Sequence, residues 1–387
     1  MKTIGVFFGG KSPEHDVSII TGEFVIAGLK KLGFAVVPIY IDNQGKWFVD
    51  EALGELKFFT EGRHKTMPKS FGEFYVDIVG PQNKLTLKKK GLTGKTIIID
   101  AAFPALHGQN GEDGTIQGLF EMLNVPYVGC DTASSALAMD KALTKMMYRA
   151  LDIPTTKFIV FGASDWLKRK NELLRETKEN LRMPLFVKPC RLGSSIGIQK
   201  VKTEQDFEFA VEVALHYDEK IIIEEAVEHC MDVTCALLGG RNPRPSLLQE
   251  SAFRGDLFSY EAKYLEGGGA QLGNNEKTII IPARLNETTT KEIQNLAIKV
   301  FRAFGCFGTA RVDFLFDTEA KKIYVNEINT MPGTLYHHLW KASGVLLDEL
   351  LQELIRLAEE RHKNKKNIIF ESDILKHANA IKLQMKK

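Results

Sequence analysis

The chain has 387 residues, of which 44% are hydrophobic and 26% charged, and its formal net charge is +2. This composition is typical of a soluble globular protein, and the length predicts two or three domains rather than one. The balance of charges argues against a nucleic-acid partner, and no stretch is apolar over the length that a bilayer requires, so no membrane partner is expected. The cysteines form no CxxC pair, which argues against a disulfide framework or a zinc site and favours a cytoplasmic location.

The first elements predict a parallel α/β layer. An apolar run at residues 3–8 ends in a Gly-Gly pair, helical spacing follows over 18–32, and a second apolar run comes next. Strand, glycine turn, helix and strand in this order are how a parallel sheet begins. Residues 54–95 show no clear period and are predicted to be an irregular insertion. Order returns with a buried strand within 96–108 and a helix near 115–124.

A different pattern follows a helix that is predicted between Asp140 and Pro154. Further strands are predicted at 184–189, 196–201, 220–227, 233–238, 278–283, 309–316 and 322–328, and a C-terminal helix at about 345–362. We therefore expect an N-terminal α/β domain (1–140), a central domain (141–223) and a C-terminal domain with a helical tail (224–387).

Two strands near the C-terminal end carry polar side chains at alternate positions. RVDFLF places Arg311 and Asp313 on one face of a strand, and YVNEIN places Glu327 and Asn329 on one face of the next. A short turn joins them, so a hairpin would gather three oxygen donors and one guanidinium. Oxygen donors are the ligands that Mg²⁺ prefers. An exposed hairpin with alternating charges explains the same pattern, and periodicity alone does not decide between the two.

Lysines favour the metal-site interpretation. Lys141, Lys188 and Lys263 each lie at the edge of an element beside apolar residues. Lys188 precedes a Gly-Ser-Ser loop, whose backbone amides and hydroxyls are suited to surround phosphates. Each lysine alone is more often a surface residue with a buried stem. Together with an oxygen-lined metal site, they provide what chemistry on Mg-ATP needs.

Taken in order, the motifs of the chain resemble those of the D-alanyl-D-alanine ligases of the ATP-grasp superfamily. They are GGKSPEHDVS, ALHGQNGEDGTIQG, VKPCRLGSSIGIQKV, YEAKY, FGTARVDF and NEINTMPG, spread over residues 4–335. The resemblance implies an ATP-grasp fold with a parallel α/β N-terminal domain, an α+β central region, and ATP held between the central and C-terminal domains. It also implies a homodimeric, ATP-dependent ligase that joins two D-alanines through an acyl phosphate for peptidoglycan synthesis.

The resemblance further implies a role for each matching residue. The residues expected to bind ATP are Lys141, Lys188, Ser194, Ser195, Glu224, Glu225, Val227, Asp232 and Lys263. The expected ligands of Mg²⁺ or Mn²⁺ are Asp313, Glu327 and Asn329. The residues expected to bind D-alanine are Glu14, His107, Arg311, Gly333 and His338. The residues expected to act in catalysis are Glu14, Ser194, Tyr264, Arg311 and Gly333.

The chain departs from the family pattern at His338, which stands where the family usually has a serine that binds the carboxylate of the second substrate. The family's ribose-binding glutamate is also replaced, and Asp232, one position away in the sequence, is the nearest carboxylate. Two alternatives stay open: a related ligase that joins D-alanine to another acceptor amino acid, and a nucleotide-binding homologue without catalysis. Retention of Glu14, Lys263 and Tyr264 argues against the second alternative, and Tyr264 favours an amine as the acceptor.

Overall fold

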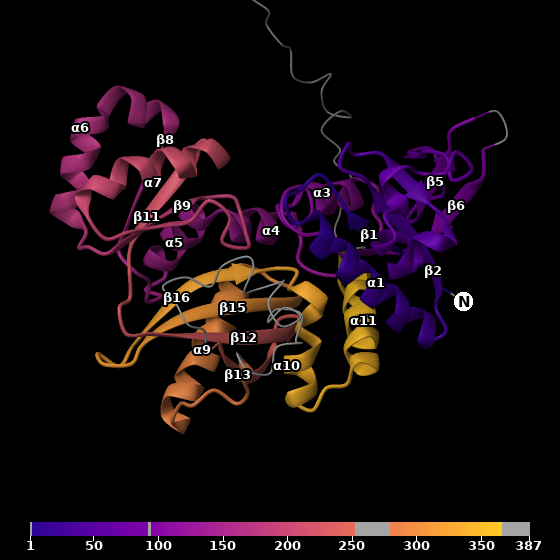
Figure 1. The fold of residues 1–387 in the computed structure, drawn as a ribbon. Helices are drawn as coiled ribbons and strands as arrows, with labels where there is room; N and C mark the ends of the chain where they lie inside the picture. The colour runs from indigo at the N-terminus through magenta and orange to yellow at the C-terminus, as the bar shows by residue number, and fades with distance from the viewer. Residues whose placement is uncertain (1, 92–93, 252–278, 366–387) are drawn as a thin grey trace, which may run out of the picture.

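The computed structural model describes residues 2–91, 94–251 and 279–365, and within these ranges three β-sheets and their helices make up the chain (Figure 1). Each sheet packs on clustered apolar side chains, and one cluster extends from the first sheet to the third. No helix in the described ranges is both long and apolar enough to cross a membrane.

The first sheet has seven strands in the order β6-β5-β4-β3-β2-β1-β7. β1 pairs in parallel with β2 and β7, as the strand, helix, strand order predicts, and the other pairs are antiparallel. The strands are β1 (Thr3–Gly9), β2 (Ala35–Ile41), β3 (Trp47–Val49), β4 (Phe74–Val76), β5 (Leu85–Lys89), β6 (Thr96–Ile99) and β7 (Ala101–Pro104). The helices and 3-10 turns in this region are α1 (His15–Lys31), η1 (Glu51–Gly54), α2 (Leu56–Thr60), η2 (Arg63–Lys65), α3 (Thr115–Met122) and α4 (Thr132–Met139).

Two predictions for this part of the chain are wrong. Residues 54–95 are not an irregular insertion, because they supply β4 and β5, which extend the parallel strands as an antiparallel edge. β4 has only three residues, too few to show a period in the sequence. The buried strand predicted within 96–108 is two strands, because the chain bends at Asp100, whose carboxylate accepts a hydrogen bond from the Thr3 amide at 2.8 Å.

The second sheet has four antiparallel strands in the order β10-β9-β11-β8. Helices α6 and α7 pack on it and bury Trp166, Leu173 and Phe207 (Figure 1). The strand predicted at 196–201 forms only over its second half, as β10. The elements are α5 (Lys141–Ala150), β8 (Phe158–Gly162), α6 (Ala163–Asn180), β9 (Leu185–Pro189), β10 (Gln199–Val201), α7 (Glu204–Tyr217) and β11 (Lys220–Glu225).

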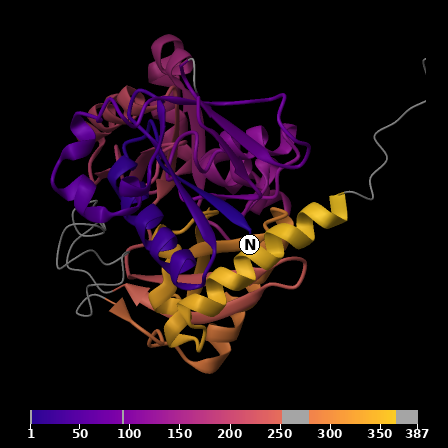
Figure 2. The same ribbon diagram turned by 90° about the vertical axis from the view of Figure 1, so that its right-hand side faces the viewer.

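The third sheet is antiparallel, in the order β14-β13-β12-β15-β16, and α9 packs against it. The long helix α11 leaves this sheet and lies beside α1 of the first (Figures 1 and 2). The elements are β12 (Cys230–Gly239), β13 (Arg244–Ser251), β14 (Ile279–Ile280), α9 (Glu287–Ala303), β15 (Gly308–Asp317), β16 (Lys322–Asn329), η5 (Gly333–Tyr336), α10 (His337–Ala342) and α11 (Leu347–Lys365).

Helix α1 packs closely on two sides. Gly22 lies so near β1 that an added Cβ would be 2.5 Å from the Phe8 side chain. Gly28 lies as near to α11, because an added Cβ would be 2.4 Å from Leu351 Cδ1. Since interiors are close-packed, a larger residue at either position would force a neighbouring side chain or the helix to shift. These contacts hold α1 against its neighbours, and Glu14 lies at the N-cap of this helix.

The three sheets occupy successive parts of the chain, over residues 3–104, 158–225 and 230–329. β11 runs across the boundary that the sequence predicts between 223 and 224, and the chain changes sheets after Glu225. The division into domains at these positions stays a prediction.

Glu23, on α1, generates a prediction about stability. Its side chain is buried, Oε1 has no hydrogen-bond partner among the described residues, and burial raises its pKa from 4.5 to about 8. Between pH 4.5 and about 8, the native chain therefore keeps a proton on Glu23 that the unfolded chain has released. The free energy of unfolding falls as the pH rises through this range. We predict that Glu23→Gln removes the loss and is more stable than the parent by about 2 kcal/mol at pH 9, but not at pH 5.

Urea denaturation at pH 5, 7 and 9 measures this difference. The exposed Glu292→Gln variant on α9 is the matched control and should follow the parent at every pH. An advantage of Glu23→Gln that does not grow with pH would contradict the prediction.

Candidate functional site

Two cavities lie between the sheets and share part of their walls. The large cavity, of about 460 Å³, receives side chains from β9 and β11 of the second sheet and from β12 and β15 of the third. The small cavity, of about 50 Å³, is bounded by the start of α1, the loop after β9 and the segment after β16. Both are lined by Lys141, Leu192, Gly193, Ser194 and Glu327. A group bound in one cavity is therefore next to a group bound in the other.

Most residues that the sequence predicts for the site line these cavities. The large cavity is lined by Lys141, Lys188, Ser194, Ser195, Glu224, Glu225, Val227, Asp232, Asp313 and Glu327. The small cavity is lined by Glu14, His107, Lys141, Ser194, Arg311, Glu327, Asn329 and Gly333. Lys263 and Tyr264 lie outside the described residues.

The hairpin of β15 and β16 gathers the predicted metal ligands around a guanidinium. In its antiparallel register Asp313 is opposite Glu327. Arg311 is opposite Asn329, so these four side chains share one face of the hairpin, as the sequence predicts. Arg311 donates to Asp313 from Nε at 2.9 Å and from Nη2 at 2.7 Å, and Asn329 Nδ2 donates to the same carboxylate at 3.2 Å. The Thr234 hydroxyl, on β12, donates to Asp313 at 2.9 Å. These donors fix the Asp313 carboxylate.

Arg311 is a buried cation at the edge of the small cavity. Its residue is 5% exposed, and the Tyr336 ring lies 4.9 Å from the guanidinium carbon. Burial disfavours the charge, but the adjacent Asp313 more than offsets this and raises the pKa of Arg311. The guanidinium therefore stays charged, and the ion pair and the ring hold it in one orientation.

The set Asp313, Glu327 and Asn329 has the donor chemistry of a magnesium site, because all three supply hard oxygen atoms. Asp313 lines the large cavity, Asn329 the small one and Glu327 both. Within the described ranges, no three His, Cys, Asp or Glu side chains are grouped so that they could hold a metal by themselves. The residues fit a divalent cation whose shell is completed by an amide oxygen, water or ligand oxygens. Their role as ligands stays a prediction.

The loop after β9 closes on the N-terminus of α1. Ser194 Oγ donates a hydrogen bond to Glu14 Oε1. A Cβ on Gly193 would be 2.9 Å from Glu14 Oε2, so a larger residue here would displace the Glu14 carboxylate. Ser194 and Ser195 have φ of 54° and 59°. A non-glycine residue in this left-handed region costs about 1 kcal/mol, so packing elsewhere must hold the loop in place.

Glu14 is a buried carboxyl that lacks a strong cationic partner in the described structure. Burial raises its pKa, the negative charge of Glu112 adds to the rise, and Ser194, His107 and Lys141 oppose it. A bound ammonium group would stabilise the ionised form. Glu14 is therefore suited to bind a cationic substrate group.

A chain of hydrogen bonds links His107 to the turn after β16. His107 Nε2 is 2.8 Å from Thr21 Oγ1, and the Thr334 amide donates to the same hydroxyl oxygen at 3.1 Å. Thr21 can then donate its own proton to Nε2, which leaves the imidazole proton on Nδ1, 3.7 Å from Glu112 Oε2. Sequence reasoning missed Glu112, although its place in GEDG, soon after the glycine-containing loop, is a signal for it.

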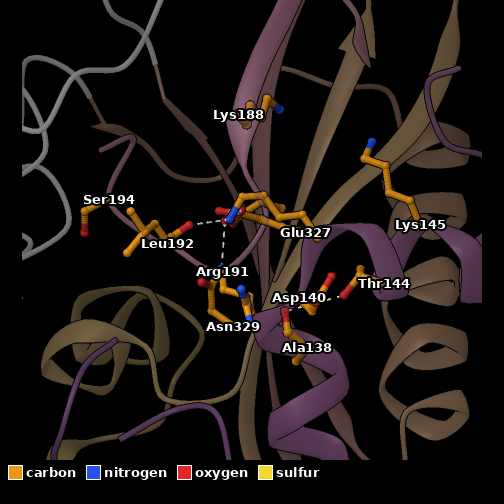
Figure 3. A network of polar contacts seen from close by, with 12 residues as sticks. Ala138, Asp140, Thr144, Lys145, Lys188, Arg191, Leu192, Ser194, Glu327 and Asn329 are labelled. Atoms are coloured by element: carbon orange, nitrogen blue, oxygen red, sulfur yellow. Dashed lines mark hydrogen bonds and ion pairs between the residues drawn. The ribbon is translucent and has the colours of Figure 1, made fainter. Parts of the chain in front are cut away.

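Lys141 begins α5 at the wall that the two cavities share. Asp140 caps this helix by accepting from two backbone amides at 3.0 and 3.1 Å. Lys141 Nζ donates to Leu192 O at 2.6 Å and lies 3.4 Å from Glu327 Oε2. Figure 3 shows Leu192, Glu327 and Asn329 gathered at this end of α5. Burial disfavours the charge of Lys141, but Glu327 raises its pKa, so a cation faces both cavities.

A second lysine of α5, Lys145, is absent from the sequence prediction. It lies one helical turn after Lys141, a spacing that puts the two lysines on one face and is the signal that could have found it. Its Nζ is 2.8 Å from Glu224 Oε2, and Lys188 Nζ is 3.4 Å from Glu224 Oε1. The side chains of Lys145 and Glu224 are 1% and 2% exposed, so a buried ion pair lies behind the wall of the large cavity.

His338 lies against Gln249 and lines neither cavity. Its Nε2 is 2.7 Å from Gln249 Oε1, and its Nδ1 is buried without a hydrogen-bond partner among the described residues. Burial, with positive charge at His337 and Arg311, lowers the pKa of His338 to about 4, so the imidazole is neutral at pH 7. A protonated imidazole is therefore not the form in which His338 would meet a substrate.

Family comparisons match the chain over most of its length. The model described as "D-ala D-ala ligase N-terminus" matches residues 3–130, and "D-ala D-ala ligase C-terminus" matches 147–356. The D-alanine–D-alanine ligase of Thermosipho melanesiensis is 38% identical over 378 residues, which cover 97% of this chain and 99% of that protein. The ligase of the same name from Geobacillus kaustophilus is 38% identical over 381 residues, 96% and 98% of the two chains.

Solved structures have the same fold. The D-alanine-D-alanine ligase from Coxiella burnetii matches with a TM-score of 0.76 at 31% identity, over 98% of this chain and all of that one. The VanG D-Ala:D-Ser ligase from Enterococcus faecalis matches with a TM-score of 0.78 at 33% identity, over 92% and 99% of the two chains.

The three sheets and the cavities between them are those of an ATP-grasp enzyme, an ATP-dependent ligase, and the fold predicted from the sequence is confirmed. The chain belongs to the D-alanine–D-alanine ligase family. Enzymes of this family use ATP and a divalent metal ion.

The approach of Gly193 to Glu14 generates a prediction about activity. We predict that Gly193→Ala lowers kcat/KM for D-alanine by about 100-fold, because its Cβ would displace the Glu14 carboxylate. Steady-state phosphate release measures the effect. Gly118→Ala on α3, where a Cβ would meet only Thr132 Oγ1 at 3.9 Å, is the matched control and should retain full activity. Full activity in Gly193→Ala as well would contradict the close approach.

Proposed function

We propose that this chain joins two D-alanines to form D-alanyl-D-alanine, with ATP converted to ADP and phosphate. The observation that carries the proposal is the wall shared by the two cavities at Lys141, Ser194 and Glu327. A nucleotide bound in the large cavity would end beside a carboxylate bound in the small one. Phosphoryl transfer to the carboxylate would give an acyl phosphate, because a carboxylate alone is a poor acyl donor.

The first step brings the negative phosphates of ATP close to a negative carboxylate. Cations at the shared wall would reduce the repulsion between them. Lys141 and Lys188 would neutralise the phosphates of ATP. Magnesium held by Asp313, Glu327 and Asn329 would act as a Lewis acid on phosphate oxygens. Because Glu327 lies 3.4 Å from Lys141, the lysine and the predicted metal ligands are already adjacent.

Glu14 would bind the ammonium group of the first D-alanine. Its carboxylate accepts a hydrogen bond from Ser194. Burial disfavours the ionised form of Glu14, and the ammonium would stabilise that form. His107 borders the same cavity and is oriented by Thr21. The carboxylate of this D-alanine would then face Lys141 and Arg311, at the side where phosphate arrives.

Arg311 and the amide of Gly333 would stabilise the tetrahedral intermediate of the second step. When the amine of the second D-alanine attacks the acyl carbon, negative charge develops on the carbonyl oxygen. Arg311 is fixed by Asp313 before this charge appears, so little reorganisation is needed. The C–O bond to phosphate then breaks, and inorganic phosphate leaves.

A second candidate is a ligase that joins D-alanine to another acceptor. Two observations favour it: His338 stands at the family's serine position, and the chain is similar to a protein named a D-Ala:D-Ser ligase. We propose that His338 binds the acceptor. With the Gln249 amide turned, Nε2 would accept a hydrogen bond and Nδ1, which is buried in this structure, would carry the proton that a carboxylate could accept.

Further proposals come from the family resemblance. Ser195, Glu225, Val227 and Asp232 would bind ATP, and Lys263 would contact its γ phosphate. Tyr264 would act in catalysis with Ser194. The enzyme would be a cytoplasmic homodimer that supplies peptidoglycan synthesis and accepts Mg²⁺ or Mn²⁺.

Phosphate release from Mg-ATP, with mass spectrometry of the product, tests the proposed reaction. D-alanine is supplied alone and then with D-serine, D-lactate, glycine or L-amino acids. The dipeptide from D-alanine alone is the expected product. Turnover only with a second compound would establish the second candidate, and ATP binding without turnover would contradict both.

His338 gives a prediction about the acceptor. We predict that His338→Ala raises the KM of the second substrate about tenfold, because one hydrogen bond is lost, and leaves the KM values of ATP and the first D-alanine unchanged. His337→Ala is the matched control, since this neighbour packs against Phe24 with the rings tilted and their centroids 4.5 Å apart. If the KM of the second substrate is unchanged in His338→Ala, then His338 only packs against Gln249 and does not bind the acceptor.

A further inference from the structure

Arg361, on α11, has no part in the proposed steps, although it makes two hydrogen bonds to backbone far away in the sequence. Nη1 donates to Gly129 O at 2.6 Å, and Nη2 donates to Tyr127 O at 2.8 Å. The guanidinium carbon lies 4.1 Å from the centre of the Tyr127 ring and 5.6 Å from that of Phe307. A planar group with two acceptors and a ring beneath it is held in one orientation. Arg361 therefore ties α11 to residues 127–129.

Charged groups near the end of α11 hold the same region. Lys365 pairs with Glu121 on α3, and the Tyr127 hydroxyl donates to this carboxylate at 2.6 Å. Burial disfavours the ionised form of Glu121, but Lys365, Tyr127 and Arg361 more than offset this and lower its pKa. Residues 127–129 are thus anchored to the third sheet through α11 and to the first sheet through α3.

Gly129 links this loop to the small cavity. A Cβ on Gly129 would be 3.2 Å from Met331 Cε, and a Cβ on Gly308 would be 3.1 Å from Gly129 Cα. The loop is therefore packed between the start of β15 and the tip of the Met331 side chain. Met331 is 5% exposed and lines the small cavity. Because groups packed this closely move together, a shift of Gly129 would free Met331 to move.

Helix α4 is a second connection from the loop to the same cavity. The Asp131 carboxylate caps this helix by accepting from the Ser134 amide at 2.9 Å. Ala138 and Met139, at the other end of α4, line the small cavity. With Met331 they form what we call the apolar wall of this cavity. The loop that Arg361 holds therefore borders both parts of the apolar wall.

The apolar wall limits what the small cavity can hold, because the cavity has a volume of only about 50 Å³. Under the proposed function, the ammonium of the first amino acid meets Glu14 and its carboxylate faces Lys141 and Arg311. Its side chain is then left to the apolar wall. A tight apolar pocket discriminates about tenfold or more against one extra methylene group.

We propose that Arg361 is a positioning residue for the choice of the first amino acid: it fixes residues 127–129, and with them the apolar wall, so that the methyl group of D-alanine fits and a larger side chain does not. This inference rests on the proposed function. Arg361 lines neither cavity, so it acts only through the loop that it holds.

Competition between D-alanine and D-2-aminobutyrate, which has one more methylene group, tests the proposal. An equimolar mixture is supplied with Mg-ATP, and tandem mass spectrometry identifies the residue at each end of the dipeptide. The first amino acid becomes the N-terminal residue and the acceptor the C-terminal one, so the two sites are measured separately. We expect the parent to favour D-alanine at the N-terminus about tenfold or more. We expect Arg361→Met to reduce this preference to below about threefold and to keep the C-terminal preference of the parent.

Arg356→Met is the matched control, because Arg356 lies on the same helix but pairs with the exposed residues Glu353 and Glu360, outside both cavities. It should keep both preferences. Arg361→Lys retains the charge but lacks the planar fork that reaches two carbonyls. It should give an intermediate N-terminal preference, and it replaces Arg361→Met if that variant does not fold.

Two results would overturn the proposal: a parent without an N-terminal preference for D-alanine, or an Arg361→Met variant that keeps this preference or changes both preferences equally. A parent that forms no dipeptide would reject the proposed function instead. Calorimetric titration of D-alanine and D-2-aminobutyrate in the presence of Mg-ADP then decides the role of Arg361. A preference for D-alanine that is lost in Arg361→Met would retain this role, and an unchanged or absent preference would reject it.

Discussion

The antiparallel register of β15 and β16 is the constraint on which the rest of the site depends. It places Asp313 opposite Glu327 and Arg311 opposite Asn329. A slip of one residue would turn the polar side chains of one strand to the other face of the sheet and break both pairs, because side chains alternate along a strand. Apolar neighbours that pack on α9 oppose such a slip, since Val312 and Val325 are both fully buried. Hydrophobic packing on one side of the sheet thereby sets the polar geometry on the other.

Around this hairpin, the chain adopts strained backbone where it meets the small cavity. Thr334, Leu335 and Tyr336 follow one another with φ of 44°, 56° and 52°, in a region that L-residues avoid at a cost of about 1 kcal/mol each. Leu335 and Tyr336 are buried in the cluster that joins the first and third sheets, and this burial offsets the strain. The turn carries the Thr334 amide to Thr21, and so connects the third sheet to α1. Strain held in this way typically marks functional segments.

Local patterns in the sequence were enough to predict the hairpin and the first βαβ unit, because each depends on spacing within a short stretch. Most residues of the cavities were predicted from the family resemblance instead. Three features could not be found in this way. The spacing from Lys141 can suggest Lys145, but its ion pair with Glu224 joins residues 79 positions apart in the sequence, and this pairing has no local signal. The contact of His338 with Gln249 spans 89 positions. The left-handed turn at Thr334 to Tyr336 contains no glycine, so its sequence does not predict its backbone.

The central claim is that the two cavities meet so that phosphate passes from ATP to a carboxylate. The most direct test uses D-alanine with ¹⁸O in its carboxylate and examines the inorganic phosphate by mass spectrometry. Transfer through an acyl phosphate leaves one substrate oxygen on the phosphate when the C–O bond breaks, so each turnover should give phosphate with one ¹⁸O. Phosphate without label, or label in AMP together with release of pyrophosphate, would contradict the account.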